Sequence, residues 1–374
     1  MKENQEISTY SSIFIVAPWQ IAGAVLRTLF LIWRRGGHSI RPYIRVGIIR
    51  VLLYNLAPRQ IQYGSKPTKE MYRSWMKSRA TKAASSQQLE AQARLRVDIE
   101  PLDSEKKSSL LWIGDRRRAK KVVFFFHGGG YFVPALKGHL EWCWRAYVAP
   151  GLEPGGVETA VAFLEYTLSP VGRFPTQLRQ AAAGLSHILA SGFRPQDVVI
   201  GGDSAGGNLT AVLLCHLIQP MPNVPEVKMA EPLGGAFLVS PWLTRHTKDA
   251  SFVENDGIDM LFTGTITETR GYLVGKDLAI VPSVAYPLDA EDLYFERLEE
   301  VVEHMYVTAG ENEVLRDQGV AYVERVRRFC SGLDLRFDLQ KKMAHDFILL
   351  EGEAGKNGRC ISDMQDWFQR LLVD

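Results

Sequence analysis

A serine in a glycine-rich turn is the residue of this sequence best suited to chemistry. Ser204 lies within Gly-Gly-Asp-Ser-Ala-Gly-Gly-Asn at residues 201–208, directly after the apolar run of residues 198–200. That run is typical of a short buried strand, and the apolar residues 209–217 are typical of a helix. A Gly-x-Ser-x-Gly turn between a strand and a helix predicts a nucleophile elbow, in which the serine hydroxyl stands clear of the sheet. The alternative is a serine that only caps the following helix.

A second glycine-rich segment follows another predicted strand, residues 122–126. It consists of His127, Gly128, Gly129 and Gly130. Glycines at the end of a strand let backbone N–H groups point into a cavity with no side chains in the way. Acyl transfer needs such donors, because its tetrahedral intermediate carries an oxyanion. We expect this loop and the N–H of Ala205 to form an oxyanion hole, with His127 organising the loop.

A serine hydroxyl becomes a good nucleophile only when a base takes its proton. His345 is the candidate base, because it lies a few residues after the predicted strand at residues 335–339. Apart from His127, the other histidines fall within predicted helices, in polar loops or at a strand start. The alternative for His345 is an ordinary histidine of a surface loop.

The base in turn needs a carboxylate that holds its tautomer and stabilises the imidazolium. Three carboxylates follow the predicted strand that ends near Thr308: Glu311, Glu313 and Asp317. Glu313 is the candidate acid. Asp317 falls one turn into the following helix, where we expect it to brace the loop or pair with Arg316. Glu311 lies close to the strand end and remains an alternative.

The elements that must position these residues alternate along the chain from about residue 95. The predicted strands are residues 94–100, 110–113, 122–126, 161–165, 198–200, 235–239, 304–308 and 335–339, the second pairing with the first. The predicted helices are residues 136–148, 175–189, 209–217, 314–329 and 363–372. This alternation predicts an α/β fold with a mostly parallel sheet between helices. The candidate residues all follow strands, at the edge where function gathers in such sheets.

Composition narrows the classes of function. The chain has 374 residues, with 46% hydrophobic and 23% charged residues, as in an ordinary globular protein. Its net charge of +2 gives no electrostatic case for nucleic acid or for an acidic substrate. The four cysteines are scattered without ligand spacing, which argues against a zinc site or a disulfide framework. We therefore expect no metal and no organic cofactor.

The first 94 residues and residues 243–300 depart from the alternation. Residues 13–33 are mostly apolar and about as long as a membrane span, but Arg27 within them is costly at the centre of a bilayer. A signal peptide fits worse, because the leading residues are not net positive. Two interpretations stay open. Residues 13–33 and 44–56 form apolar helices that cover an active site in a cytoplasmic protein, or residues 13–33 attach the protein to a membrane.

The motifs together resemble the hormone-sensitive-lipase branch of the α/β-hydrolases over roughly residues 95–374. The matching segments are residues 127–130, residues 202–208 with Asp203, Ser240-Pro241-Trp242, Leu315-x-Asp317 and His345-x-Phe347. The resemblance implies Ser204 as nucleophile, Glu313 as acid and His345 as base, in the chain order of α/β-hydrolases. It implies Gly129, Gly130 and Ala205 as the oxyanion donors. The family usually has aspartate where this chain has Glu313.

The same resemblance implies that residues 1–94 and 243–300 form a cap on a catalytic domain of residues 95–374. The apolar N-terminus is also similar to that of fungal steryl acetyl hydrolases and of hydrolases from fungal secondary-metabolite pathways. The sequence thus predicts a serine carboxylester hydrolase for a small or medium apolar ester, such as an acetyl ester of a natural product. One alternative is a biosynthetic enzyme that uses the same residues for condensation or cyclisation. A non-catalytic ligand receptor is another.

Overall fold

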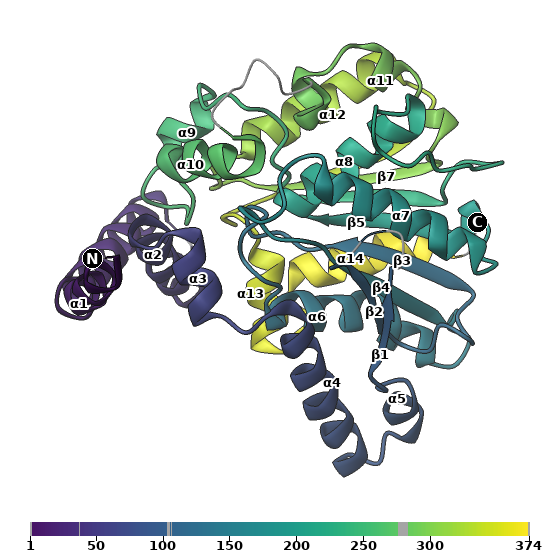
Figure 1. The fold of residues 1–374 in the computed structure, drawn as a ribbon, viewed down its shortest axis with the longest axis horizontal. Helices are drawn as coiled ribbons and strands as arrows, with labels where there is room; N and C mark the ends of the chain where they lie inside the picture. Colours follow the sequence, from purple (N-terminus) through teal and green to yellow (C-terminus); the bar gives the residue numbers. More distant parts are fainter. Residues whose placement is uncertain (1, 37, 103–104, 106, 276–282, 373–374) are drawn as a thin grey trace.

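The structure is a computed structural model that describes residues 2–36, 38–102, 105, 107–275 and 283–372, with side chains from Pro18 onward. Residues 276–282, within the predicted cap segment 243–300, therefore lie outside the described residues. Eight strands form one sheet in the order β1-β2-β4-β3-β5-β6-β7-β8 (Figure 1). The strands are β1 (Asp98–Pro101), β2 (Ser109–Ile113), β3 (Lys121–Phe126), β4 (Thr159–Glu165), β5 (Val198–Asp203), β6 (Gly235–Val239), β7 (His304–Gly310) and β8 (Asp334–Gln340).

Helices account for most of the remaining chain. Before the sheet come α1 (Lys2–Arg35), α2 (Ile40–Asn55), α3 (Pro58–Gly64), α4 (Thr68–Ser85) and α5 (Leu89–Ala93). Between and after the strands come α6 (Lys137–Cys143), α7 (Thr176–Ala190), α8 (Ala205–Ile218), α9 (Ala250–Glu254), α10 (Thr263–Val274), α11 (Leu293–Glu296), α12 (Arg316–Phe329), α13 (Phe347–Ala354) and α14 (Arg359–Arg370). A π turn, Trp144–Val148, extends α6.

The sheet is parallel from β4 to β8, as the sequence pattern predicts. Only β1 with β2 and β2 with β4 pair antiparallel. β3, β5, β7 and β8 consequently end at the same edge of the sheet. The loops that carry the candidate residues follow these four strands, so topology brings them together.

Burial on both faces explains why the central strands are continuous apolar runs. Along β3, Val122, Phe124 and Phe126 pack into one core cluster, which α7, α8 and α12 cover. Val123 and Phe125 pack into the cluster on the opposite face, which α6 and α14 cover. Every one of these five side chains is fully buried.

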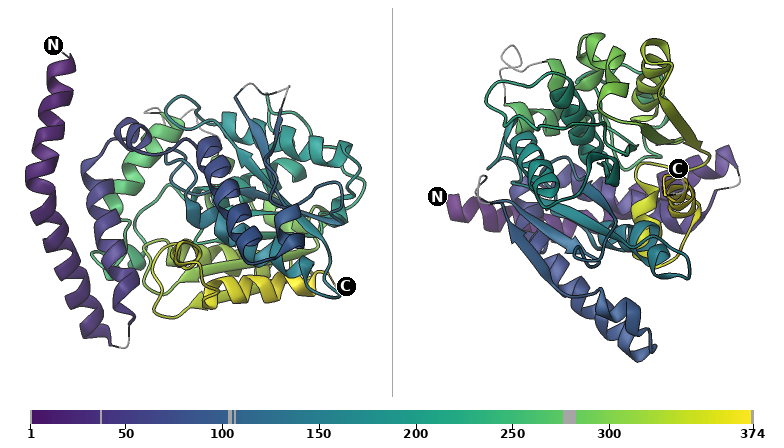
Figure 2. Two further views of the ribbon diagram at one scale, coloured as in Figure 1. Left: turned by 90° about the horizontal axis from the view of Figure 1, so that it is seen from below. Right: turned by 90° about the vertical axis from the view of Figure 1, so that its right-hand side faces the viewer.

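The N-terminal helices lie at one side of the sheet domain, and buried side chains of α1, α2 and α4 join the core cluster on one face of the sheet. α1 and α2 lie side by side, and α2 separates most of α1 from the rest of the molecule (Figure 2). No helix in the described part of the chain combines the length and the apolar character that a bilayer crossing needs. α3, α4 and α5 then lead to β1.

Several element boundaries differ from the sequence prediction; α8, for example, begins at Ala205 rather than at residue 209. Two of the differences have a tertiary reason. The first strand begins at Asp98 rather than at residue 94, because Arg94 ends α5 and pairs with Glu90 one turn back, at 2.6 Å. The last helix begins at Arg359 rather than at residue 363. The carboxylate of Glu351 accepts the N–H groups of Cys360 and Ile361 there, at 3.2 and 2.9 Å, and so caps a turn that has no capping residue of its own.

Candidate active site

Ser204 occupies a strained turn between β5 and α8. Its backbone angles are φ 51° and ψ −112°, a region that non-glycine residues rarely adopt. A side chain at Gly202 or Gly206 would collide with the carbonyl oxygen of Phe126 at the end of β3. Glycine on both sides of the serine is therefore required by the close approach of β3, and the hydroxyl is left at the edge of the sheet.

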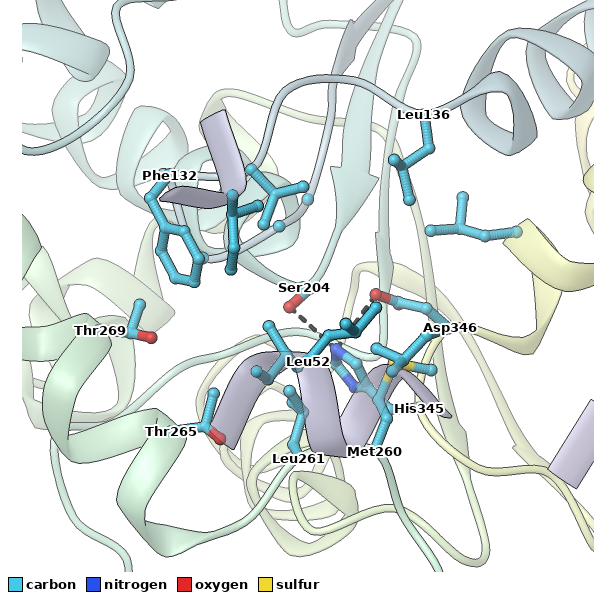
Figure 3. Close-up of a pocket in the computed structure, with 18 of the residues that line it drawn as sticks. Leu52, Phe132, Leu136, Ser204, Met260, Leu261, Thr265, Thr269, His345 and Asp346 are labelled. Carbon is cyan, nitrogen blue, oxygen red and sulfur yellow. Dashed lines mark hydrogen bonds and ion pairs between the residues drawn. The ribbon is translucent and has the colours of Figure 1, made fainter. Parts of the chain in front are cut away.

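His345 meets this serine from the loop between β8 and α13. Its Nε2 lies 2.9 Å from Ser204 Oγ, within hydrogen-bond distance (Figure 3). The side chain of His345 is 3% exposed, so water competes little for this contact. The structure thus brings together the two residues that the sequence predicts as nucleophile and base, although 141 positions separate them.

Glu313 completes the arrangement on the far side of the imidazole. Its Oε2 lies 3.4 Å from His345 Nδ1, and its side chain is fully buried. Glu311 points elsewhere, since its Oε2 accepts the N–H of Lys342 at 2.8 Å. Asp317 accepts the N–H of Ser251 and pairs with Arg316, each at 2.8 Å, which is the bracing role predicted for it. Of the three carboxylates, Glu313 is the one that contacts the histidine.

The glycine-rich loop lies across the cavity from His345. Gly129 and Gly130 have φ of 98° and 58°, so a side chain at either position would be strained. Within the described residues, neither of their N–H groups has a hydrogen-bond partner. Ala205 begins α8, where the first N–H groups of a helix are free of intrahelical bonds. These three amides are available to an oxyanion.

Asp203 and His127 hold that loop in place. Asp203 Oδ1 accepts the N–H of Gly128 at 3.1 Å, and a side chain at Gly128 would collide with the same carboxylate. Burial lowers the pKa of His127 to about 3, so its ring is neutral and its Nδ1 donates to the carbonyl of Gly128 at 2.8 Å. The hydroxyl of Tyr166 donates to the carbonyl of His127 at 2.7 Å.

His139 supports the elbow from the other direction, a role that its place in a predicted helix did not reveal. Its Nδ1 accepts the N–H of Leu136 at 3.0 Å, so the ring proton is on Nε2. That Nε2 lies 3.2 Å from Asp203 Oδ2. Burial would lower the pKa of His139, but the carboxylate of Asp203 outweighs it and raises the pKa.

Two buried acids at the site were missed at the sequence level. Asp346 follows the histidine in the left-handed conformation, at φ 52°, and its Oδ2 lies 3.1 Å from His345 Nε2. Asp259 comes from the segment predicted to form a cap. Its Oδ1 accepts the N–H groups of Met260 and His345, at 2.7 and 3.3 Å, and its Oδ2 accepts the N–H of Val314 at 2.7 Å. Asp259 thereby joins the loop of the acid to the loop of the base.

These carboxyl groups dominate the electrostatics of the histidine. Burial would lower the pKa of His345, but the carboxyl groups of Asp346 and Glu313 outweigh it and hold that pKa well above its usual range. Burial raises the pKa of Asp346, although the charge of His345 opposes the shift. Burial also raises the pKa of Asp259, to about 6. The site therefore stabilises the imidazolium that forms when the histidine takes a proton.

A cavity of about 460 Å³ opens above the serine. Its lining is mostly apolar and comes from α2, α3, the glycine-rich loop and the segment that leads into α10. Figure 3 shows Leu52 and Leu261 beside Ser204 and His345, with Phe132 and Thr269 on the opposite wall. A small or medium apolar ligand fits such a cavity with its reactive group against Ser204.

Comparison with known proteins agrees with this geometry. Residues 123–349 match the family described as having the alpha/beta hydrolase fold. This chain belongs to that family. Among solved structures it is similar to carboxyl esterase 2 from the mycorrhizal fungus Tuber melanosporum, with a TM-score of 0.61 and 19% identity over 74% of this chain and 86% of that one. It is also similar to an esterase from the bacterial hormone-sensitive lipase family, with a TM-score of 0.61 and 21% identity over 87% and 96% of the two chains.

Curated relatives point in the same direction. The chain is 25% identical to the carboxylesterase NlhH of Mycobacterium tuberculosis over 202 residues, which cover 52% of this chain and 58% of that protein. It is 27% identical to the carboxylic ester hydrolase LipN of the same species, over 56% of each chain. The matches thus span little more than half the length of these relatives. The predicted resemblance to the hormone-sensitive-lipase branch is confirmed by the comparisons as a set.

Proposed function

We propose that this protein is a serine carboxylester hydrolase for a small or medium apolar ester. The contact that carries the proposal is the 2.9 Å approach of His345 Nε2 to Ser204 Oγ, on an elbow that faces an apolar cavity. Neighbours described as carboxylesterases and esterases support it. A natural-product ester, as the fungal resemblance implies, stays a prediction.

In the proposed reaction, Ser204 Oγ attacks the ester carbonyl while His345 Nε2 takes the hydroxyl proton. The N–H groups of Gly129, Gly130 and Ala205 stabilise the resulting oxyanion. The intermediate collapses as His345 protonates the departing alcohol, which leaves an acyl group on Ser204. Water, deprotonated by His345, then attacks the acyl-enzyme and releases the acid. Glu313 holds the imidazole and stabilises its charged form in both steps.

We further propose that residues 1–94 and 243–300 supply the cap over this cavity. Leu52 of α2 and Ile61 of α3 line it from the first segment, and Leu261 and Ile266 line it from the second. Because these four side chains are apolar, the cap favours an apolar acyl or alcohol group.

The mechanism is tested by replacing the nucleophile. Ser204→Ala should lower hydrolysis of p-nitrophenyl butyrate by on the order of 10⁶-fold and abolish labelling by a fluorophosphonate probe. Ser191→Ala is the matched control, because this exposed serine lies at the end of α7 and its hydroxyl donates to the carbonyl of His187. Retained turnover in Ser204→Ala would overturn the mechanism. Absence of labelling in the parent protein would favour a receptor.

A further inference from the structure

α1 exposes a stripe of large apolar side chains. The side chains of Trp19, Leu26, Phe30 and Trp33 are 81%, 67%, 56% and 74% exposed. Their spacings of seven, four and three residues place them on one face of the helix. We call these four residues the α1 stripe.

The opposite side of α1 fixes the direction in which the stripe points. Thr28 is buried and donates to the carbonyl of Gly257 at 2.8 Å. Ile32 is 3% exposed, and Arg27 pairs with Asp256 at 3.0 Å. These contacts hold one face of α1 against residues 256–257, so the α1 stripe, on the opposite face, is turned toward solvent.

The stretch of sequence that contains the stripe carries only positive charges. Between Glu6 and Glu70 the sequence has no aspartate or glutamate but nine lysines and arginines, whereas the whole chain has a net charge of only +2. The remainder of the chain is therefore net negative. Arg34, Arg41 and Arg59 are exposed and make no ion pair with the described part of the chain. This N-terminal region is thus both cationic and rich in exposed aromatic side chains.

We propose that the α1 stripe and the exposed arginines of the N-terminal region dock the protein onto an anionic phospholipid surface. Tryptophan and other large apolar side chains insert at the boundary between head groups and acyl chains, and cationic side chains pair with anionic head groups. A second copy of this chain is a poorer occupant, because its own cationic region would face the first. The helix lies on the surface rather than crossing it.

Docking has a consequence for the substrate, which rests on the proposed function. α2 packs against α1 and also lines the cavity with Ile49, Leu52 and Leu53. Leu52 is 42% exposed, and its neighbour Tyr54 is 71% exposed. The helix that packs against α1 is therefore also a wall of the cavity. The substrate class that fits is an ester that partitions into the bilayer.

The docking is tested by flotation of the full chain with vesicles. Phosphatidylcholine vesicles that contain phosphatidylserine should bind the protein, and added salt should weaken the binding. One variant replaces all four residues of the α1 stripe by serine, and a second carries Arg34→Glu, Arg41→Glu and Arg59→Glu. Each should lower binding by on the order of tenfold or more. Leu89→Ser with Val171→Ser is the matched control, because these residues are 72% and 70% exposed on other elements.

Further readouts separate the docking from the catalysis. Hydrolysis of soluble p-nitrophenyl butyrate should be unchanged in every variant, whereas hydrolysis of a long-chain ester embedded in the vesicles should fall with binding. Loss of activity in the parent protein would contradict the proposed function and leave the flotation result standing. Failure of the parent to bind anionic vesicles, or equal binding by the serine variant, would overturn the docking. If the parent protein does not bind vesicles but forms a dimer that the serine variant abolishes, the α1 stripe is instead an interface with a second copy of this chain.

Discussion

Asp346 Oδ2 lies 3.1 Å from His345 Nε2, the same nitrogen that lies 2.9 Å from Ser204 Oγ. One ring nitrogen thus has two acceptors. When the ring is charged, its Nε2–H can serve both the carboxylate and the hydroxyl. The carboxylate therefore stabilises the imidazolium, the form in which the histidine cannot accept the proton of Ser204.

Replacing this carboxylate should move the pH profile. The charge of Asp346 raises the pKa of His345, so Asp346→Asn should lower that pKa and keep the base neutral to lower pH. We expect the acidic limb of kcat/KM to shift down by roughly 1 pH unit. Asp334→Asn is the control, because Asp334 pairs with His304 at 2.7 Å on the surface. An unshifted limb in Asp346→Asn would contradict this role.

Two neighbouring glutamates should differ sharply in their effect on catalysis. Glu313→Gln should lower kcat by on the order of 10³- to 10⁴-fold, because an amide can no longer hold the imidazole in the required tautomer or stabilise its charge. Glu311→Gln should change kcat little, since an amide oxygen can still accept the N–H of Lys342. Steady-state kinetics on a soluble ester decides between them. A larger loss of kcat in Glu311→Gln than in Glu313→Gln would identify Glu311 as the acid.

Asp259→Asn should loosen both catalytic loops at once. Both oxygens of Asp259 accept backbone N–H groups, so an amide nitrogen in place of either would face a donor with another donor. We expect a loss of about 1–3 kcal/mol in the free energy of unfolding and a lower kcat. Thermal unfolding and kinetics of the same preparation measure the two effects. A variant with the stability and kcat of the parent would show that the loops do not depend on this side chain.

The same acid should add a pH dependence to stability. Its pKa in the folded protein, about 6, lies above that of an unfolded aspartate. The folded state therefore binds the proton more tightly, and this contribution to stability is full below about pH 4 and is lost as pH rises through about 6. The difference in unfolding free energy between the parent and Asp259→Asn should shrink across that window. A difference independent of pH would contradict the raised pKa.

Tyr43 should couple the N-terminal helices to the catalytic loops. Its hydroxyl donates to the carbonyl of Lys342 at 3.0 Å and accepts the side-chain N–H of Asn312 at 2.8 Å. Tyr43→Phe removes both bonds and should lower kcat several-fold, which corresponds to an increase of about 1 kcal/mol in the activation free energy. Tyr54→Phe on the same helix is the control, since Tyr54 is exposed. Equal kcat in both variants would show that the N-terminal helices do not influence the catalytic loops through Tyr43.

The elbow and the glycine-rich loop were predictable because their requirements are local. Gly202 and Gly206 mark a turn that admits no side chain, and the short strand before Ser204 shows where the turn must lie. The local sequence could not decide between Glu313 and Glu311 as the acid. It depends on where the loop after β7 meets the loop after β8, which only the packed structure fixes.

The roles of Asp259 and Glu351 could not be predicted for the same reason. Asp259 lies in a polar stretch of weak periodicity, and nothing near it in sequence shows that its carboxylate reaches Val314 and His345. Glu351 caps α14 from the preceding helix, so the sequence around residue 359 contains no start signal. Side chains that satisfy distant backbone groups have no periodic signature.

Arg35, in the last turn of α1, donates to the side-chain oxygen of Asn312 at 2.6 Å, and Asn312 is the residue before Glu313. The helix that we propose to rest on lipid therefore also braces the loop that carries Glu313. A preparation truncated before α2 would lose this brace but keep the residues of α2 and α3 that line the cavity, so low turnover in such a preparation would reflect a less firmly held catalytic loop.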